Sequence, residues 1–314
     1  MDRLAPVRLL PAFKDYLWGG TKLKERYNKK SDLDIVAESW ELSCHKDGQS
    51  IVSGGEFDGK TLSEYIDAVG KQALGEKAEG FDYFPILIKF IDAKGSLSIQ
   101  VHPDDEYALR VEGEYGKTEM WYILEADEDA YLYYGFNRDV TKEELRKRIE
   151  DNTILEVLNK VKTKKGDVFF IDSGTVHAIG GGNVICEIQQ NSNTTYRVYD
   201  YDRRDKDGNP RELHIDKAIE VSKLTKAPEL EKTNSAGILA ECKYFTVKKL
   251  TVAGEAVERV DNTSFRSVVV VDGQGKMTLG ENELELKKGD SIFVPAQEAE
   301  IKFDGNLEII ISYI

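Results

Sequence analysis

A glutamine and a histidine stand two residues apart in the segment SLSIQVHPDD, which begins at Ser96. The apolar, β-prone residues around them predict a strand that ends at Pro103. Because alternate side chains of a strand face the same side, Gln100 and His102 should enter the same space. Imidazole is the commonest metal ligand, and an amide oxygen suits a borderline ion such as Zn²⁺. The segment therefore predicts one half of a metal site.

Two further residues complete the predicted ligand set. The chain has four histidines: His45, His102, His177 and His214. His177 stands at the end of another β segment in the same predicted domain, and Glu119 opens the run EMWYIL. A lone buried histidine is more often a hydrogen-bonded core residue than a ligand, so the prediction depends on the whole set. Mixed nitrogen and oxygen ligands with room for water or substrate are typical of a catalytic zinc site. His45 and His214 lie in polar, loop-like contexts, and we expect both at the surface.

Two positive charges lie close to these residues in the sequence. Lys117 precedes Glu119 by two residues and would project into the same pocket if the strand begins there. Arg197 follows the polar loop QQNSNTTY, which would be costly to bury without ligands or partners. The alternative for each is a solvated charge or a surface salt bridge.

Short β-type runs separated by Gly, Asp, Asn and Pro turns dominate the chain, as an antiparallel sandwich or barrel requires. They cover residues 84–91, 97–101, 120–126, 130–136, 167–171, 184–190 and 196–201. Segments 61–74 and 141–161 instead space their apolar residues at three and four and begin with Thr and an acidic first turn. We predict that both are amphipathic helices inserted in a mainly β scaffold.

A weak internal repeat suggests two related β domains. KKGDVFFIDSGTVHAI, starting at Lys164, aligns without gaps on KKGDSIFVPAQEAEIK, starting at Lys287, and places Glu300 opposite His177. The segment 224–237 is rich in Lys, Glu, Pro and Ser and fits a linker. We therefore expect a catalytic domain over residues 1–223, with a helical insertion at about 139–161. A degenerate domain without metal ligands should cover residues 238–314.

Composition excludes several classes of protein. The formal net charge is −14 at pH 7 and no basic block stands out, which argues against a nucleic-acid binder. The three cysteines show no metal-type pairing, and neither a signal core nor an 18-residue apolar run is present. We expect a cytoplasmic protein without a membrane partner.

The motifs LSIQVHPDD, GKTEMWYIL and GTVHAI, followed by VICEIQQNSNTTYRVYDYDR, together resemble the type I mannose-6-phosphate isomerases in their short bacterial form. The early segment PAFKDYLWGGTKL resembles that family as well, so the similarity spans almost the whole chain. The resemblance implies two cupin-like β-barrel or jelly-roll domains and one divalent metal ion per chain, usually zinc. It also implies that the enzyme interconverts mannose 6-phosphate and fructose 6-phosphate.

Residue by residue, the resemblance places the family's metal ligands on Gln100, His102, Glu119 and His177. It places Lys117 and Arg197 in the substrate site, Glu187 at an acidic position nearby, and Ser98 and Lys89 as weaker substrate contacts. Trp18 matches a tryptophan that closes the pocket. The C-terminal domain carries no histidine, so a second metal is not expected there.

Aldose to ketose conversion requires a base that removes a weakly acidic carbon-bound proton and passes through a cis-enediolate. Glu187 or Lys117 fits the base, and the planar fork of Arg197 fits the substrate phosphate or the enediolate. Three alternatives remain: an isomerase or epimerase of another sugar on this scaffold, a non-catalytic sugar-binding cupin, or a structural protein with satisfied polar core groups. We expect a monomer or homodimer.

Overall fold

The computed structural model describes residues 4–204, 208–229 and 237–314, and most of its ordered segments are strands. Contacts divide the chain into two compact units. The first unit takes the described residues up to Asp15, the segment Thr21–Phe90 and the described C-terminal residues from Gly237. The second unit takes Tyr16–Gly20 and the described residues from Ile91 to Glu229. This division by contacts interleaves along the chain, whereas the expected domains 1–223 and 238–314 follow one another, and that boundary stays a prediction.

The first unit holds one large open sheet. Its elements are β1 (Val7–Leu10), β2 (Ala12–Lys14), α1 (Lys22–Arg26), β3 (Glu38–Leu42), β4 (Ile51–Ser53), α2 (Leu62–Val69), the 3₁₀ turns Lys71–Leu74 and Glu76–Gly80, β14 (Ile238–Glu241), β15 (Thr246–Val260), β16 (Arg266–Leu279), β17 (Asn282–Lys287), β18 (Ser291–Val294) and β19 (Ala299–Tyr313). The strand order is β14-β15-β19-β16-β18-β1-β4, with β17 paired to β16. The N-terminal strand β1 pairs with β18, with Val7 opposite Phe293.

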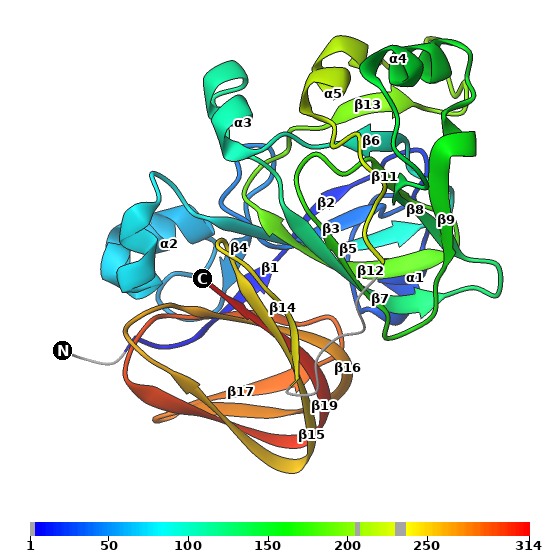
Figure 1. The fold of residues 1–314 in the computed structure, drawn as a ribbon. Helices are drawn as coiled ribbons and strands as arrows, with labels where there is room; N and C mark the ends of the chain where they lie inside the picture. Colours follow the sequence, from blue (N-terminus) through cyan, green and yellow to red (C-terminus); the bar gives the residue numbers. More distant parts are fainter. Residues whose placement is uncertain (1–3, 205–207, 230–236) are drawn as a thin grey trace. The chain divides into compact units, whose positions relative to one another are not determined.

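Strand β15 bends back within its own length. Lys248 and Glu258 form an ion pair of 2.5 Å, although ten residues of straight strand would span about 33 Å. Gly254, between them, has a φ of +93°, which favours glycine. Its neighbour β19 stays paired with it along the whole strand, so the two curl together (Figure 1).

The bend is marked by a row of glycines across three strands. Gly254 lies opposite Gly305, and Gly305 lies opposite Gly275 in β16. A Cβ on Gly275 would lie 2.2 Å from the carbonyl oxygen of Asp304, and a Cβ on Gly305 would lie 2.6 Å from the Gly275 Cα. The backbones therefore approach too closely for side chains at these two positions. Below the bend, the sheet encloses an apolar cluster that includes Val268, Phe303 and Ile309.

The second unit contains the segments that the sequence analysis singled out. β5 (Ile86–Ala93) carries the chain from the first unit into the second. The remaining elements are β6 (Ile99–Val101), α3 (Asp105–Val111), β7 (Glu119–Ala126), β8 (Tyr131–Phe136), α4 (Lys142–Glu150), the 3₁₀ turn Ile154–Val157, β9 (Leu158–Lys162), β10 (Val168–Ile171), β11 (His177–Ile179), β12 (Asn183–Gln190), β13 (Tyr196–Tyr199) and α5 (Ile215–Val221). One sheet has the order β13-β6-β11-β8-β9, and β7 lies between β10 and β12. Helices α4 and α5 pack against the five-stranded sheet through Leu145, Ile149, Ala218 and Ile219 (Figure 1).

The predicted helices begin where expected but end early. Thr61 and Glu64 form a reciprocal capping box on α2, and Thr141 accepts a hydrogen bond from the Glu144 amide at the start of α4. The prediction of a helix through residue 161 is wrong, because α4 ends at Glu150 and Asn152 takes a left-handed φ of 57°. The apolar residues after Asn152 instead form a 3₁₀ turn and then strand β9, which pairs with β8.

The two repeat copies form the same turn. The Lys164 amide donates to Asp167 Oδ2 at 2.9 Å, and the Lys287 amide donates to Asp290 Oδ2 at 2.9 Å. The glycines inside the two turns have φ values of 92° and 91°. Strands β10 and β18 follow directly. Each predicted β run overlaps a strand whose ends lie within two residues of the predicted ones.

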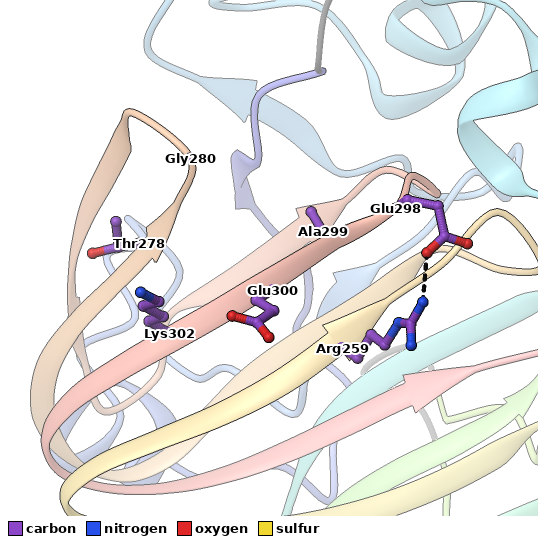
Figure 2. A pocket seen from close by; sticks show the side chains of 7 residues that line it. All are labelled: Arg259, Thr278, Gly280, Glu298, Ala299, Glu300 and Lys302. Carbon is purple, nitrogen blue, oxygen red and sulfur yellow. Dashed lines mark hydrogen bonds and ion pairs between the residues drawn. The ribbon is translucent and has the colours of Figure 1, made fainter.

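Glu300, which the repeat aligns with His177, lies on the outer face of the first unit's sheet. It is exposed, while its neighbour Ile301 points into the apolar cluster. Figure 2 shows Glu300 and Lys302 lining a surface pocket in which Arg259 pairs with Glu298 at 2.7 Å. Within the residues that the structure describes, no helix is long and apolar enough to span a lipid bilayer.

Candidate metal centre

Strand ends bring three of the predicted ligands together in the second unit. His102 directly follows β6, Glu119 is the first residue of β7, and His177 is the first residue of β11. All three are fully buried or nearly so, and one ligand atom from each lies within 4.8 Å of the others. Gln100 joins them because β6 and β11 pair with Gln100 opposite His177.

The two imidazoles share one carboxylate. His177 Nε2 lies 3.2 Å from Glu119 Oε1, and His102 Nε2 lies 3.6 Å from Glu119 Oε2. The amide of Gln100 lies 3.4 Å from His177 Nε2, and a half-turn of that amide presents its oxygen instead of its nitrogen. The centre is thus a compact group of two nitrogens, one carboxylate and one amide.

Backbone carbonyls fix the orientation of both imidazole rings. His102 Nδ1 lies 2.9 Å from the Thr194 carbonyl oxygen, and His177 Nδ1 lies 2.8 Å from the Thr175 carbonyl oxygen. A carbonyl can only accept, so each Nδ1 carries the hydrogen and donates it. Each Nε2 then keeps its lone pair and turns it toward Glu119, as a metal-binding histidine requires.

The protonation states also suit a cation. Burial, reinforced by the positive charge of Lys117, holds the pKa of His102 well below its usual value, so the ring is neutral at pH 7. Burial alone would raise the pKa of Glu119, but Lys117, His102 and His177 outweigh it and hold that pKa well below the usual value. The carboxylate is therefore ionised.

The donor set fits a divalent ion. Among the described residues, neither oxygen of Glu119 receives a hydrogen bond of good geometry, although both are buried. A desolvated carboxylate flanked by two imidazole lone pairs and an amide oxygen matches the ligand preferences of Zn²⁺. Lys117 Nζ lies 2.9 Å from Glu119 Oε2 and 3.1 Å from His102 Nε2, so this lysine contacts the ligands directly.

Glu187 is held on the same face of the sheet as Glu119. In the pairing of β12 with β7, Glu187 lies opposite Trp121 and Gln189 lies opposite Glu119. The indole nitrogen of Trp121 donates to Glu187 Oε1 at 2.9 Å. The Trp121 ring also meets the His177 ring edge-on, with centroids 5.3 Å apart. Trp121 thereby links the predicted acidic residue to a predicted ligand.

Arg197 lies beside the centre on β13, opposite Gln100 in β6. Its Nη1 donates to the Glu212 carbonyl at 2.9 Å, and burial together with repulsion from Arg211 lowers its pKa. Arg203 and Arg211 both pair with Asp200, three residues further along the chain than Arg197. We call Arg197, Arg203, Arg211 and Asp200 the arginine cluster. Sequence reasoning missed its last three members; the run YDYDRR was the available signal for Asp200 and Arg203, and Arg211 lies outside it.

The remaining predicted site residues are all buried: they are Ser98, Trp18 and Lys89. Ser98 is buried just before β6, two residues from Gln100. Trp18 is buried and its carbonyl accepts from the Gly95 amide at 2.8 Å. Lys89 belongs to the first unit, where its Nζ lies 3.7 Å from Glu38 Oε2 and over the Trp40 ring.

The two remaining histidines differ from the expectation of surface positions. His45 is only 5% exposed, so that prediction is wrong, because its ring packs edge-on against Trp40 and accepts from the Asp47 amide. His214 is half-buried and accepts from the Arg197 amide at 3.2 Å.

Comparisons with known proteins show which family and which solved structures the chain resembles. Residues 7–133 match the family described as "Phosphomannose isomerase type I, catalytic domain", and residues 235–314 match "Mannose-6-phosphate isomerase, cupin domain". The chain is 42% identical to mannose-6-phosphate isomerase ManA of Bacillus subtilis (strain 168), over 98% of this chain and 99% of the relative. It is 39% identical to mannose-6-phosphate isomerase of Streptococcus mutans, over 98% of each.

A solved structure shows the same fold. The crystal structure of the mannose 6-phosphate isomerase from Bacillus subtilis matches with a TM-score of 0.89 at 38% identity, covering 99% of this chain and 100% of that one. The predictions of a mainly β, cupin-type fold and of the family resemblance are thereby confirmed.

Proposed function

The chain belongs to the type I phosphomannose isomerase family and interconverts mannose 6-phosphate and fructose 6-phosphate, and we propose that it does so at the centre around Glu119. One observation carries this proposal. His102 and His177 turn their Nε2 lone pairs toward a single buried carboxylate, and carbonyl oxygens hold both rings in that orientation. Such preorganisation is typical of a catalytic metal site.

We propose that Gln100, His102, Glu119 and His177 hold one Zn²⁺ per chain. The mixed nitrogen and oxygen donors and the neutral imidazole of His102 support this choice of metal. When bound, the ion supplies a Lewis acid that polarises the sugar's oxygens and stabilises the negative charge of a cis-enediolate.

The chain's own residues then move two protons. A base takes the proton from C2 of the open-chain aldose and returns it to C1, while a second proton moves from the C2 hydroxyl to the C1 oxygen. We assign the carbon-bound proton to Glu187, because a carboxylate can accept a proton directly and Trp121 fixes its direction. We assign the oxygen-bound proton to Lys117, a donor that already lies beside two ligands.

We propose that the arginine cluster binds the phosphate group of the substrate. Three guanidinium groups against one carboxylate leave it positive within a chain of net charge −14. A planar guanidinium suits bidentate contact with phosphate, and phosphate binding can hold the reacting carbons in place. Ser98 and Lys89 are proposed as further substrate contacts, and Trp18 as a residue that closes the pocket.

A direct assay tests the proposed site. Purified protein should convert mannose 6-phosphate, lose activity with a chelator and regain it with Zn²⁺. The His102→Ala variant should contain almost no zinc, whereas His45→Ala, the matched control, should keep the wild-type content. Equal zinc in the wild type and His102→Ala would remove His102 from the site. Turnover of only a different sugar would contradict the proposed substrate.

The cellular setting is also a proposal. None of the three cysteines forms a disulfide, which supports a reducing, cytoplasmic location. We further propose that the enzyme acts as a monomer or homodimer on a small sugar phosphate.

A further inference from the structure

The first part of the polar loop that precedes Arg197, residues 189–192, is buried rather than solvated. Gln189, Gln190, Asn191 and Ser192 are each at most 3% exposed. Burying so many polar groups is costly unless each finds a partner. The Gln189 side chain satisfies two of them by donating to the carbonyls of Gln190 and Ser192 at 2.8 and 2.6 Å. The loop therefore has a defined internal structure.

Gln190 holds the peptide that lies between Lys117 and Glu119. Its side-chain Oε1 accepts from the Thr118 backbone N–H at 2.9 Å, and its backbone N–H donates to the Thr118 carbonyl at 3.1 Å. Gln190 thus forms hydrogen bonds with both the N–H and the C=O of Thr118. Because one neighbour of Thr118 is a predicted metal ligand and the other contacts two ligands, these hydrogen bonds set the position of both.

Asp105, the first residue of α3, connects Gln190 to this helix. Its Oδ1 accepts from Gln190 Nε2 at 2.7 Å and from the Gly116 amide at 2.9 Å. Gly116 itself packs so tightly that a Cβ would lie 2.4 Å from the Asp104 carbonyl carbon. Lys117 donates its amide to the Pro103 carbonyl at 2.9 Å. Three successive amides, at residues 116 to 118, are therefore each fixed by a different part of the chain.

The same loop also orients His102. The Thr194 carbonyl accepts from His102 Nδ1 at 2.9 Å, and Glu114 holds Thr194 Oγ1 and the Asn193 amide, each at 3.3 Å. One connected network thus reaches Lys117, Glu119 and His102, while His177 is oriented separately by Thr175.

We infer that Gln190 is a positioning residue, which with Asp105 holds Lys117 and Glu119 in place on the metal centre. The inference rests on the proposed isomerase site. Gln190 touches neither substrate nor metal in this role, and it acts only through the backbone of Thr118. Residues that orient metal ligands in this way typically change metal affinity or activity about 10- to 100-fold when replaced.

Introducing a negative charge at residue 190 tests this role. Gln190→Glu places a carboxylate against Asp105 and should push the side chain away from Thr118. We expect kcat to fall about 10- to 100-fold with little change in KM, and zinc loss to EDTA to accelerate by a similar factor. The double variant D105N/Q190E restores a donor facing an acceptor and should recover most of both losses.

Asn183→Asp is the matched control. Asn183 is a buried amide at the other end of β12, and it donates to the Tyr131 and Gly180 carbonyls and accepts from Thr163. This variant should lose thermal stability but keep its kcat and its rate of zinc loss. If Gln190→Glu yields no folded protein, Asp105→Ala, at a half-buried surface position, should show the same losses in smaller measure.

The outcomes separate this inference from the proposed function. Zinc loss from Gln190→Glu no faster than from Asn183→Asp, or a double variant no better than Gln190→Glu, would overturn the positioning role. Zinc retention is measured without any sugar, so it decides the role of Gln190 even if the enzyme turned over a different substrate. Absence of metal-dependent turnover in the wild type would instead defeat the proposed function.

Discussion

At the scale of single residues, separate measurements can test the proposed roles of Glu187 with the carbon-bound proton and of Lys117 with the oxygen-bound proton. Glu187→Gln keeps the hydrogen bond to Trp121 within reach but removes the base, so turnover should fall about 100- to 10,000-fold. Solvent-deuterium exchange at C2 of the sugar should fall in parallel, while the zinc content stays at the wild-type level. Lys117→Met should slow turnover yet retain exchange at C2. Normal exchange in Glu187→Gln would move the base role to Lys117.

The pH dependence of stability should reveal Asp200. Burial alone would raise its pKa, but Arg211 and Arg203 outweigh burial and lower it below the ordinary value of 3.8. The folded state thus favours the charged form, so its contribution to stability is complete above about pH 4 and is lost as the pH falls through the folded pKa. Asp200→Asn should lower the free energy of unfolding by about 1–3 kcal/mol at pH 7.

Urea unfolding at pH 7 and at decreasing pH below 4 measures this effect. The difference between the wild type and Asp200→Asn should shrink toward zero as the pH falls. Asp202→Asn, at an exposed position in the same loop, serves as the control and should change stability by less than about 0.5 kcal/mol. A difference that stays constant with pH would mean that the charge of Asp200 is not what stabilises the cluster.

At the scale of elements, the glycine row explains how long strands form a curled sheet. Gly275→Ala should cost about 1–3 kcal/mol or more, because its methyl group would overlap the Asp304 carbonyl. Gly80→Ala, where the added methyl group would meet nothing within 4 Å, is the matched control and should be nearly neutral. Chemical denaturation of both variants checks the prediction, and equal stability would show that the strands relax around the bend.

Local patterns predicted the strands well because short apolar runs bounded by turn residues mark buried strands, and β5 and β12 are buried along their whole length. They also singled out His102, Glu119 and His177, whose side chains the structure brings within 4.8 Å of one another. They failed after Glu150, where apolar spacing of three and four is met by a 3₁₀ turn and a strand instead of a helix. Pairing with β8 decides that segment, and residues distant in sequence supply the pairing.

Other features of the site leave little trace in the sequence. The groups that orient His102 and His177 are carbonyls, which every residue possesses, so no residue type marks them. His45 is buried because Trp40 packs against it, although its neighbours in the chain are polar. The roles of Gln190 and Asp105 likewise depend on contacts across 85 residues.

At the scale of the whole molecule, the two units interleave along the chain, which crosses between them four times. A fragment of residues 1–223 would keep β1 and β4 but lose the six other strands of their eight-stranded sheet. We expect that fragment to aggregate or to melt without a cooperative transition, whereas the full chain melts cooperatively. Circular dichroism during heating measures this. A cooperatively melting fragment that binds zinc would instead support an independent domain ending at residue 223.

The pairing of β1 with β18 also sets the order of events on the ribosome. Strand β1 is among the first segments to be made, and its partner β18 follows about 280 residues later. At roughly 5–20 residues per second, β1 waits on the order of tens of seconds for that partner. The contiguous stretch from Ile91 to Glu229 is complete well before then. The residues of the metal centre are therefore synthesised while the N-terminal strand still lacks this partner, so we expect chaperone supply to affect the yield of active enzyme.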